Sequence, residues 1–103
     1  MPSVKNRNSP SGRVASQKFP GVLFDGGTVS TVTVSIKTIS VPGVKVATDV
    51  LVGVNSVQKT GLAAVASRIA ADDVVEIALI NPTAASITTG TVTYTFSIQH
   101  FDL

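Results

Sequence analysis

The chain has 103 residues, of which 44% are hydrophobic and only 14% charged, and it contains no cysteine. Its length fits one small domain with a thin core, since so short a chain buries only about 60–65% of its unfolded surface. The lack of cysteine excludes disulfide frameworks and thiolate metal sites. The aliphatic excess over an ordinary soluble domain favours burial between subunits, so we expect an oligomer.

The net charge of +2 is divided unevenly along the chain. Residues 1–24 carry four basic and no acidic side chains, a net charge of +4. Residues 25–103 carry four basic and six acidic side chains, a net charge of −2. The first stretch also lacks a sustained period of 2 or 3.6 and is interrupted by Pro and Gly. We therefore predict an extended basic N-terminal arm over residues 1–27 and a folded domain over residues 28–103.

Apolar residues within the arm distinguish it from a freely disordered tail, which seldom carries them. We expect an extended segment that becomes ordered on another surface, with Phe19 and Phe24 as anchors. The alternative is that residues 19–24 form the first edge strand of the domain. The residues expected to contact a partner are the basic side chains and the aromatic anchors of the arm: Lys5, Arg7, Arg13, Lys18, Phe19 and Phe24.

Residues 28–41 follow the arm with an almost uninterrupted run of β-branched residues, the class enriched in strands. The apolar phase slips between Val29 and Val32 and again between Ile36 and Ile39. Such slips are typical of a β-bulge or of a bend between two sheets. We predict a strand that is irregular at both places.

A turn at Pro42-Gly43 ends this strand, and further strands are predicted over residues 44–46 and 49–54. In the second of these, Val50, Val52 and Val54 alternate onto one face. The candidate residues for the core or an oligomer interface come from this strand and from the one over residues 74–80: Val50, Val52, Val75, Ile77 and Leu79.

Residues 62–71 are ambiguous, because their alanines and the spacing of Leu62, Val65 and Ile69 also suit a helix. Turn residues bound the segment closely on both sides, and its neighbours have strand patterns. We predict a strand over residues 62–69, with a helical turn as the alternative.

The last two strands have the clearest patterns. Residues 74–80 are apolar on both faces except at Glu76, as in a strand covered on both sides. From residue 91 onward, Thr and Ser form one face of a strict period of two, and the other face is apolar: Val92, Tyr94, Phe96 and Ile98. Six to eight short strands without intervening helices predict an all-β fold, an antiparallel β-sandwich or jelly-roll-like domain.

Catalytic chemistry has few candidates in this sequence. His100 is the sole histidine, and neither a G-x-S-x-G elbow nor a nucleotide-binding glycine motif occurs. A lone histidine at a strand end is most often solvated or caps a backbone group, so we expect no enzyme and no cofactor. The acidic residues Asp72, Asp73 and Glu76 suit a calcium ion chemically. They lack the spaced loop of a dedicated site, and a solvated turn is the favoured interpretation.

The cations of the arm also suit phosphate contacts with nucleic acid. They are spread over fourteen residues, and the whole chain has only five aromatic residues for base stacking. We therefore favour an acidic protein surface over nucleic acid as the partner of the arm. The sequence contains no run of about 18 apolar residues, so it predicts no membrane-spanning helix. No apolar segment typical of a secretory signal follows the N-terminal charges.

A recognisable order of motifs runs through residues 28–99. It consists of TVSTVTVSIKTISVPGVKVATDVLVGVN followed by GLAAVASRIAADDVVEIALINPTAASITTGTVTYTFSI. A Thr/Ser/Val strand, a Pro-Gly turn, an Asp-Val-Leu-Val strand, an Ala-Ala-Asp turn and an Asn-Pro loop precede a final alternating strand. This order resembles small β-sandwich or jelly-roll modules of tailed-bacteriophage virions, most like capsid decoration (cement) proteins.

The resemblance implies a non-enzymatic structural protein, made in the host cytoplasm and located on the capsid surface of the virion. Its implied partners are the major capsid protein at capsomer junctions and itself, commonly as a homotrimer, with no membrane contact. The alternative is a head- or tail-fibre or adhesin module for host-surface recognition. The loops over residues 55–60 and 81–91 would then bind glycans, although they contain no aromatic residue for sugar stacking.

Overall fold

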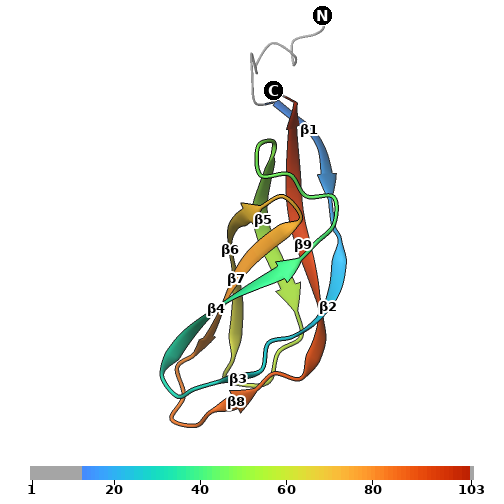
Figure 1. Ribbon diagram of the computed structural model, residues 1–103. Helices are drawn as coiled ribbons and strands as arrows, with labels where there is room; N and C mark the ends of the chain where they lie inside the picture. The colour runs from blue at the N-terminus through green and yellow to red at the C-terminus, as the bar shows by residue number, and fades with distance from the viewer. Residues whose placement is uncertain (1–12, 103) are drawn as a thin grey trace, which may run out of the picture.

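The computed structural model describes residues 13–102, which form an all-β, antiparallel structure (Figure 1). No helix occurs among these residues, so the described part of the chain has none that is long and apolar enough to cross a membrane. Its strands in chain order are β1 (Arg13–Lys18), β2 (Gly21–Asp25), β3 (Thr28–Val29), β4 (Thr33–Ser40), β5 (Asp49–Ser56), β6 (Ala63–Ala71), β7 (Val74–Asn81), β8 (Ile87–Thr88) and β9 (Thr91–Asp102).

One sheet, the β9 sheet, is built around the longest strand. β1 and β2 pair with successive halves of one edge of β9, and β5 pairs with the other edge. Between β1 and β2, the Pro20 carbonyl accepts a hydrogen bond from the Phe96 amide at 3.0 Å. The two short strands thus continue each other along β9.

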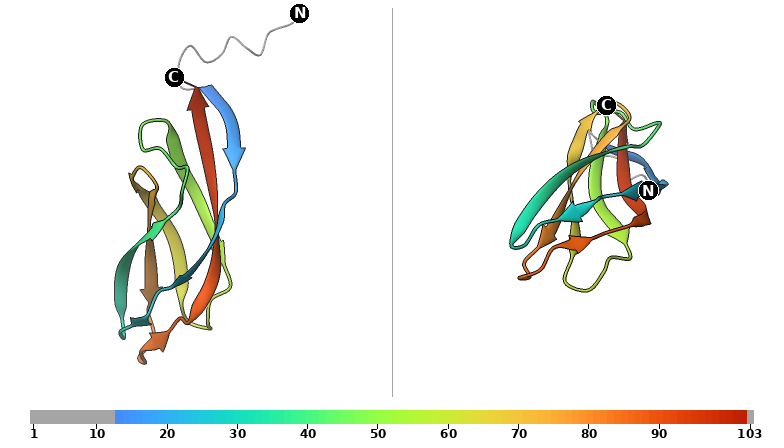
Figure 2. Two further views of the ribbon diagram at one scale, coloured as in Figure 1. Left: turned by 45° about the vertical axis from the view of Figure 1, so that its right-hand side comes forward. Right: turned by 60° about the horizontal axis from the view of Figure 1, so that its bottom comes forward.

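The second sheet, the β7 sheet, has the order β4-β7-β6. The two sheets lie face to face as a β-sandwich, with β3 and β8 paired across one end (Figure 2). The inner faces follow the alternation of the strands, and their central residues are at most 1% exposed: Val75, Ile77 and Leu79 from β7, and Tyr94, Phe96 and Ile98 from β9. Three of the five core-or-interface candidates, those on β7, are therefore core residues.

The segment preceding β3 differs from the predicted arm. Residues 13–25 form β1 and β2 of the β9 sheet, so the edge strand is the correct alternative for residues 19–24. Phe24 packs edge-to-face on Tyr94, with ring centroids 5.9 Å apart. The boundary expected at residue 27 consequently falls after two strands of the sandwich.

The two predicted phase slips have different outcomes. The first is a turn between β3 and β4, where Val32 has a φ of +46°, an uncommon region for a β-branched residue. The second is wrong, because β4 pairs with β7 in unbroken register past Ile36 and Ile39. Unbroken alternation places Ile39 in the core and leaves Val34 and Ile36 on the outer face of the sheet.

In β5 a register shift occurs between Leu51 and Gly53. Val50 lies before this shift and Val52 lies within it, and they are 49% and 57% exposed. Val54 lies after the shift and packs against the core. The prediction that Val50, Val52 and Val54 share one face is therefore wrong. A bulge adds one residue to a strand and so reverses the side on which later residues lie.

The strand predictions for two other segments have different outcomes. Residues 63–71 form β6, which confirms the strand prediction over the helical turn. Residues 44–46, a predicted short strand, lie instead in the loop between β4 and β5. That loop is held by side chains from other strands, which gives it a role in the polar cluster described next.

Candidate binding surfaces

The structure places only some of the arm residues that were expected to contact a partner. Lys5 and Arg7 lie outside the described residues. Arg13 begins β1, where its Cα partner is Asp102. Phe19, between β1 and β2, is 60% exposed, so it remains available to a partner in a way that the half-buried Phe24 is not.

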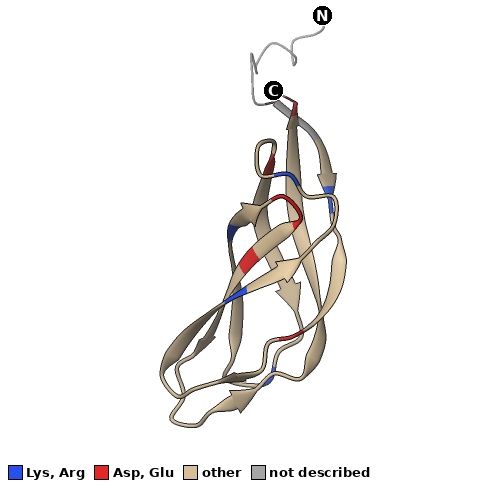
Figure 3. Ribbon diagram, viewed as in Figure 1, with Lys and Arg blue, Asp and Glu red and all other residues tan. Residues whose placement is uncertain are grey.

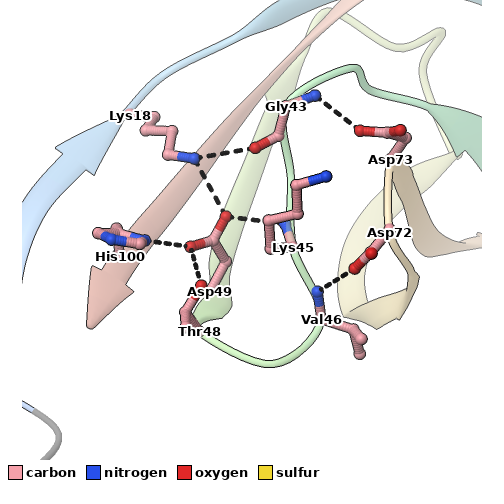
Figure 4. Close-up of polar contacts among 9 residues, drawn as sticks. All are labelled: Lys18, Gly43, Lys45, Val46, Thr48, Asp49, Asp72, Asp73 and His100. Carbon is pink, nitrogen blue, oxygen red and sulfur yellow. Dashed lines mark hydrogen bonds and ion pairs between the residues drawn. The ribbon is translucent and has the colours of Figure 1, made fainter. Parts of the chain in front are cut away.

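Lys18, another of these residues, belongs to a cluster around the buried carboxylate of Asp49 (Figure 4). Its ammonium lies 3.1 Å from Asp49 Oδ2, and His100 Nδ1 lies 2.7 Å from Asp49 Oδ1. The Lys45 amide donates to Oδ2 at 3.0 Å, and the Thr48 hydroxyl donates to Oδ1 at 3.4 Å. The carboxylate thereby joins β1, β5, β9 and the β4–β5 loop.

This environment changes the acidity of Asp49. Burial by itself raises the pKa of a carboxyl group, because it disfavours the charged form. Here the hydrogen bonds from His100, the Lys45 amide and Lys18, together with the positive charge of Lys18, outweigh burial and lower the pKa to about 2 from 3.8. Asp49 is therefore ionised, and its hydrogen-bond and ion-pair partners come from the chain itself.

The two aspartates of the β6–β7 turn fasten the same loop from the other sheet. The Gly43 amide donates to Asp73 Oδ1 at 2.8 Å, and the Val46 amide donates to Asp72 Oδ1 at 3.0 Å (Figure 4). Lys18 Nζ also donates to the Gly43 carbonyl at 3.1 Å. The β4–β5 loop is therefore tied to both sheets by charged side chains.

Glu76, the third acidic residue of the predicted cluster, points elsewhere. It accepts a hydrogen bond from the Ser67 hydroxyl at 2.8 Å and forms an ion pair with Arg68 at 3.3 Å, both on β6. Within residues 13–102, no group of three or more His, Cys, Asp or Glu side chains is arranged to hold a metal ion. The acids hold loops and strands together. His100 contacts Asp49, and its side chain is also 37% exposed.

The opposite end of the sandwich is organised by the buried Asn81. Its amide nitrogen donates to the carbonyls of Val29, Ser30 and Ala85 at 2.8–3.1 Å, and its oxygen accepts the Thr83 amide at 3.0 Å. One side chain thus fixes both the β3–β4 turn and the β7–β8 loop. Because every polar atom of this amide has a partner, its burial leaves no unsatisfied hydrogen-bonding group.

The outer face of the β9 sheet is mostly polar. The residues of β9 that alternate away from the core are hydroxyl and amide side chains, Thr91, Thr93, Thr95, Ser97 and Gln99. Three aliphatic side chains, Leu23, Val50 and Val52, are exposed on the flanking strands. Val50 and Val52 were candidates for the core or an interface, and the structure places them here, outside the core.

The outer face of the β7 sheet is aliphatic over most of its area. Val34, Ile80 and Ala63 pair across the three strands, and Ile36, Ala78 and Val65 form the adjacent row. We call these six residues the aliphatic face. Val34, Ile36 and Val65 are 56%, 55% and 43% exposed. Charged residues gather toward the β4–β5 and β6–β7 loops and leave the β3–β8 side of this sheet without charge (Figure 3).

The sequence contained a signal for this face that the prediction missed. In β4, Val34 and Ile36 alternate with Ser35 and Lys37, which by itself suggests that the valine and isoleucine point inward. The buried Ile39 has the opposite parity, and this was interpreted as a bulge. Continuous alternation anchored on Ile39 would have placed the aliphatic pair outside.

No protein-family model, curated protein or solved structure matches this chain. The functional proposal therefore rests on the surfaces of the chain and on the resemblance of its motifs.

Proposed function

We propose that this chain is a non-enzymatic virion structural protein, a bacteriophage capsid decoration (cement) protein that binds the outer shell at capsomer junctions and stabilises it. The observation that carries the proposal is the amount of apolar side chain left uncovered by a complete sandwich. Ten large hydrophobic residues are exposed among those described: Phe19, Leu23, Val32, Val34, Ile36, Val46, Val50, Val52, Val57 and Val65. Extended exposed apolar surface marks sites of protein association.

The polar cluster supports a role in attachment more than one in catalysis. His100 and Asp49 form the kind of pair that orients a general base, but the carboxylate also holds Lys18 and the Lys45 amide. These contacts join strands that are far apart in the sequence. These residues hold β1 against β9 and β5. They therefore fix the start of the described chain on the sandwich.

The proposed mechanism is stabilisation by mass action. A protein that binds the assembled shell but not its dissociated subunits shifts the equilibrium toward the shell. The basic residues that precede β1 would contact acidic surface of the major capsid protein. Several copies joined as an oligomer, a homotrimer by the resemblance, would bind with avidity if their arms reach the shell together.

Removal of residues 1–12 tests the contribution of the arm. This truncation leaves β1 and β2 intact, whereas removal of residues 1–24 would delete one edge of the β9 sheet. We expect the truncated protein to keep its circular dichroism spectrum and thermal midpoint but to lose co-sedimentation with capsids that lack this protein.

The matched charge variants are Lys5→Ser/Arg7→Ser in the arm and Lys45→Ser/Lys59→Ser on the exposed surface of the sandwich. Both pairs remove two positive charges. The arm pair should weaken capsid binding at least tenfold, and the surface pair should have a smaller effect. Normal decoration by the truncated protein would show that the arm is not the attachment segment.

The alternative function, a head- or tail-fibre or adhesin module, has one favourable observation. The β5–β6 and β7–β8 loops lie together, because a Cβ atom built on Gly61 would be 2.8 Å from Thr83 Cγ2. They form the end of the sandwich away from the start of β1 (Figure 1), with Val57 86% exposed. Specific binding on a glycan array that Val57→Ser or Thr60→Ala abolishes would favour this function over capsid decoration.

A further inference from the structure

We propose that the aliphatic face of the β7 sheet is the surface through which two copies of this chain associate. This inference goes beyond the proposed function: an isologous contact joins two copies, so it is separate from the threefold contact of the homotrimer that the resemblance implies. It does not require capsid binding, because the contact would form between free copies of the chain.

The sheet register makes the six residues of the aliphatic face contiguous. Residues directly opposite each other on one face of an antiparallel pair have Cβ atoms about 4.5–5.5 Å apart. Two successive rows across three strands are apolar. Ala78 in the centre is only 9% exposed, because the larger side chains around it cover it. The result is a continuous apolar surface without a polar position inside it.

An antiparallel sheet with one face in water normally carries polar residues on that face. The outer face of β9 follows this rule, whereas that of β4 does not. Val34 and Ile36 are more than half exposed although the sandwich below them is complete. A covering partner would remove this apolar area from water.

The charges at the margin favour a second copy as that partner. The next row beyond the aliphatic face is Thr38, Glu76 and Arg68, and its two charged groups form an ion pair with each other. The face is therefore electrically balanced and offers no net charge to select an oppositely charged partner. A twofold axis lying in the interface at right angles to β7 would superimpose the apolar rows and place the two ion pairs at opposite ends. Such an isologous contact brings no like charges together.

The area of the face predicts the strength of the contact. Three strands about 4.8 Å apart and about eight residues at roughly 3.3 Å each give about 400 Å² for the whole outer face of the β7 sheet, of which the two rows of the aliphatic face make up about half. Two copies would cover at most about 800 Å², and about 400 Å² through the aliphatic face alone, both less than the roughly 1,200 Å² at which standard stable interfaces begin. We therefore expect reversible, concentration-dependent association, which would strengthen when copies are held close together on a common scaffold.

The β4 edge of the same sheet is a poor alternative contact. Lys37 lies on the inner face of β4, in register with Ile77, and β4 is the terminal strand of its sheet in the described part of the chain. An inward-pointing charge on an edge strand opposes the addition of a further strand, which would bury it. This lysine therefore disfavours strand addition at β4 as the contact between copies.

Sedimentation equilibrium of the full chain over a wide concentration range tests the proposal. The wild-type mass should rise above the 10.6 kDa of one chain as concentration increases. The variant Val34→Thr/Ile36→Thr/Val65→Thr should weaken association at least tenfold, because threonine keeps the strand preference and removes apolar contact. The matched control, Leu23→Thr/Val50→Thr/Val52→Thr, changes exposed aliphatic residues of the β9 sheet and should associate within twofold of wild type.

Thiol crosslinking provides a second measurement that does not depend on the triple variant folding. The chain has no cysteine, so single replacements Ile36→Cys and Val52→Cys label one sheet each. A short bifunctional thiol reagent should join Ile36→Cys copies and leave Val52→Cys copies as monomers. A wild-type chain that stays at monomer mass throughout, or crosslinking only through Val52→Cys, would overturn the proposal. Either result is obtained without a capsid, so it is separate from failure of the capsid-binding experiment.

Discussion

Turned away from the core, β9 presents hydroxyl and amide side chains, whereas β4 presents Val34 and Ile36. The central inward residues of the two sheets, on β7 and β9, are alike, since they are aliphatic or aromatic and at most 1% exposed. A single sandwich therefore has one outer face suited to water and one suited to contact with protein. The difference shows that burial inside this domain is not sufficient to account for its aliphatic content.

The largest expected effect separates the inner from the outer side of the β7 sheet. Ile77 is fully buried and Ile36 is 55% exposed. Ile77→Ala should lower the free energy of unfolding by about 3 kcal/mol through lost burial and a cavity, whereas Ile36→Ala should cost less than about 1 kcal/mol. Urea denaturation at low protein concentration measures both. Equal losses would mean that the aliphatic face is already covered within one chain.

The next effect concerns the polar fastening of the β9 sheet. Asp49→Asn should lower stability by about 2–3 kcal/mol, because it leaves groups of Lys18 and His100 without their charged partner. Hydrogen exchange should accelerate at β1 amides more than at β7 amides. Asp25→Asn is the control, since it removes the same charge at an exposed position and an asparagine oxygen can still accept from the Gly27 amide. Uniform acceleration in both sheets would argue against a local clamp.

The lowered pKa of Asp49 also predicts a pH dependence. Its folded pKa of about 2 lies below the ordinary 3.8, so the folded chain binds fewer protons than the unfolded chain between these values. The contribution, about 2 kcal/mol, is fully present above pH 3.8 and is lost as pH falls toward 2. The stability difference between wild type and Asp49→Asn should shrink over this interval. A difference that stays constant would contradict the assignment.

The smallest effect concerns the turn that leads into β4 of the β7 sheet. Val32 has a φ of +46°, and a left-handed conformation costs a β-branched residue roughly 1–2 kcal/mol. Val32→Asn should raise stability by about 1 kcal/mol, because asparagine tolerates this region better. Thr31→Asn, at a neighbouring exposed position without positive φ, should change stability little. If Val32→Asn also weakens self-association, the exposed valine takes part in the contact between copies.

Strands with an uninterrupted pattern were predictable from the sequence. The alternation from Val92 to Ile98 gave both the strand and its buried face, because a period of two has only one solution when one face is apolar. β7 and β6 were also predicted, the latter from its bounding turns. The faces of β4 and β5 were not, because the presence of a bulge depends on the pairing partner: β4 has none, and β5 has one.

The polar cluster could not be predicted for a different reason. Lys18 and His100 are 31 and 51 residues from Asp49 in the sequence, and their proximity follows from the pairing of β1 and β5 with opposite edges of β9. Residues 13–25 were predicted as part of the basic arm, and their two strands were missed. Edge strands gain their order from the strand beside them, which a local pattern does not contain.

The central place of β9 has a consequence for folding during synthesis. β1, β2 and β5 all take β9 as their hydrogen-bonded neighbour, and β9 is made after them. During translation, at about 5–20 residues per second, the earliest strands wait several seconds for their partner. The pairing is also distant in sequence, which slows folding. A nascent chain halted before Thr91 would lack the strand that unites this sheet, so the β9 sheet cannot be completed until β9 has been made.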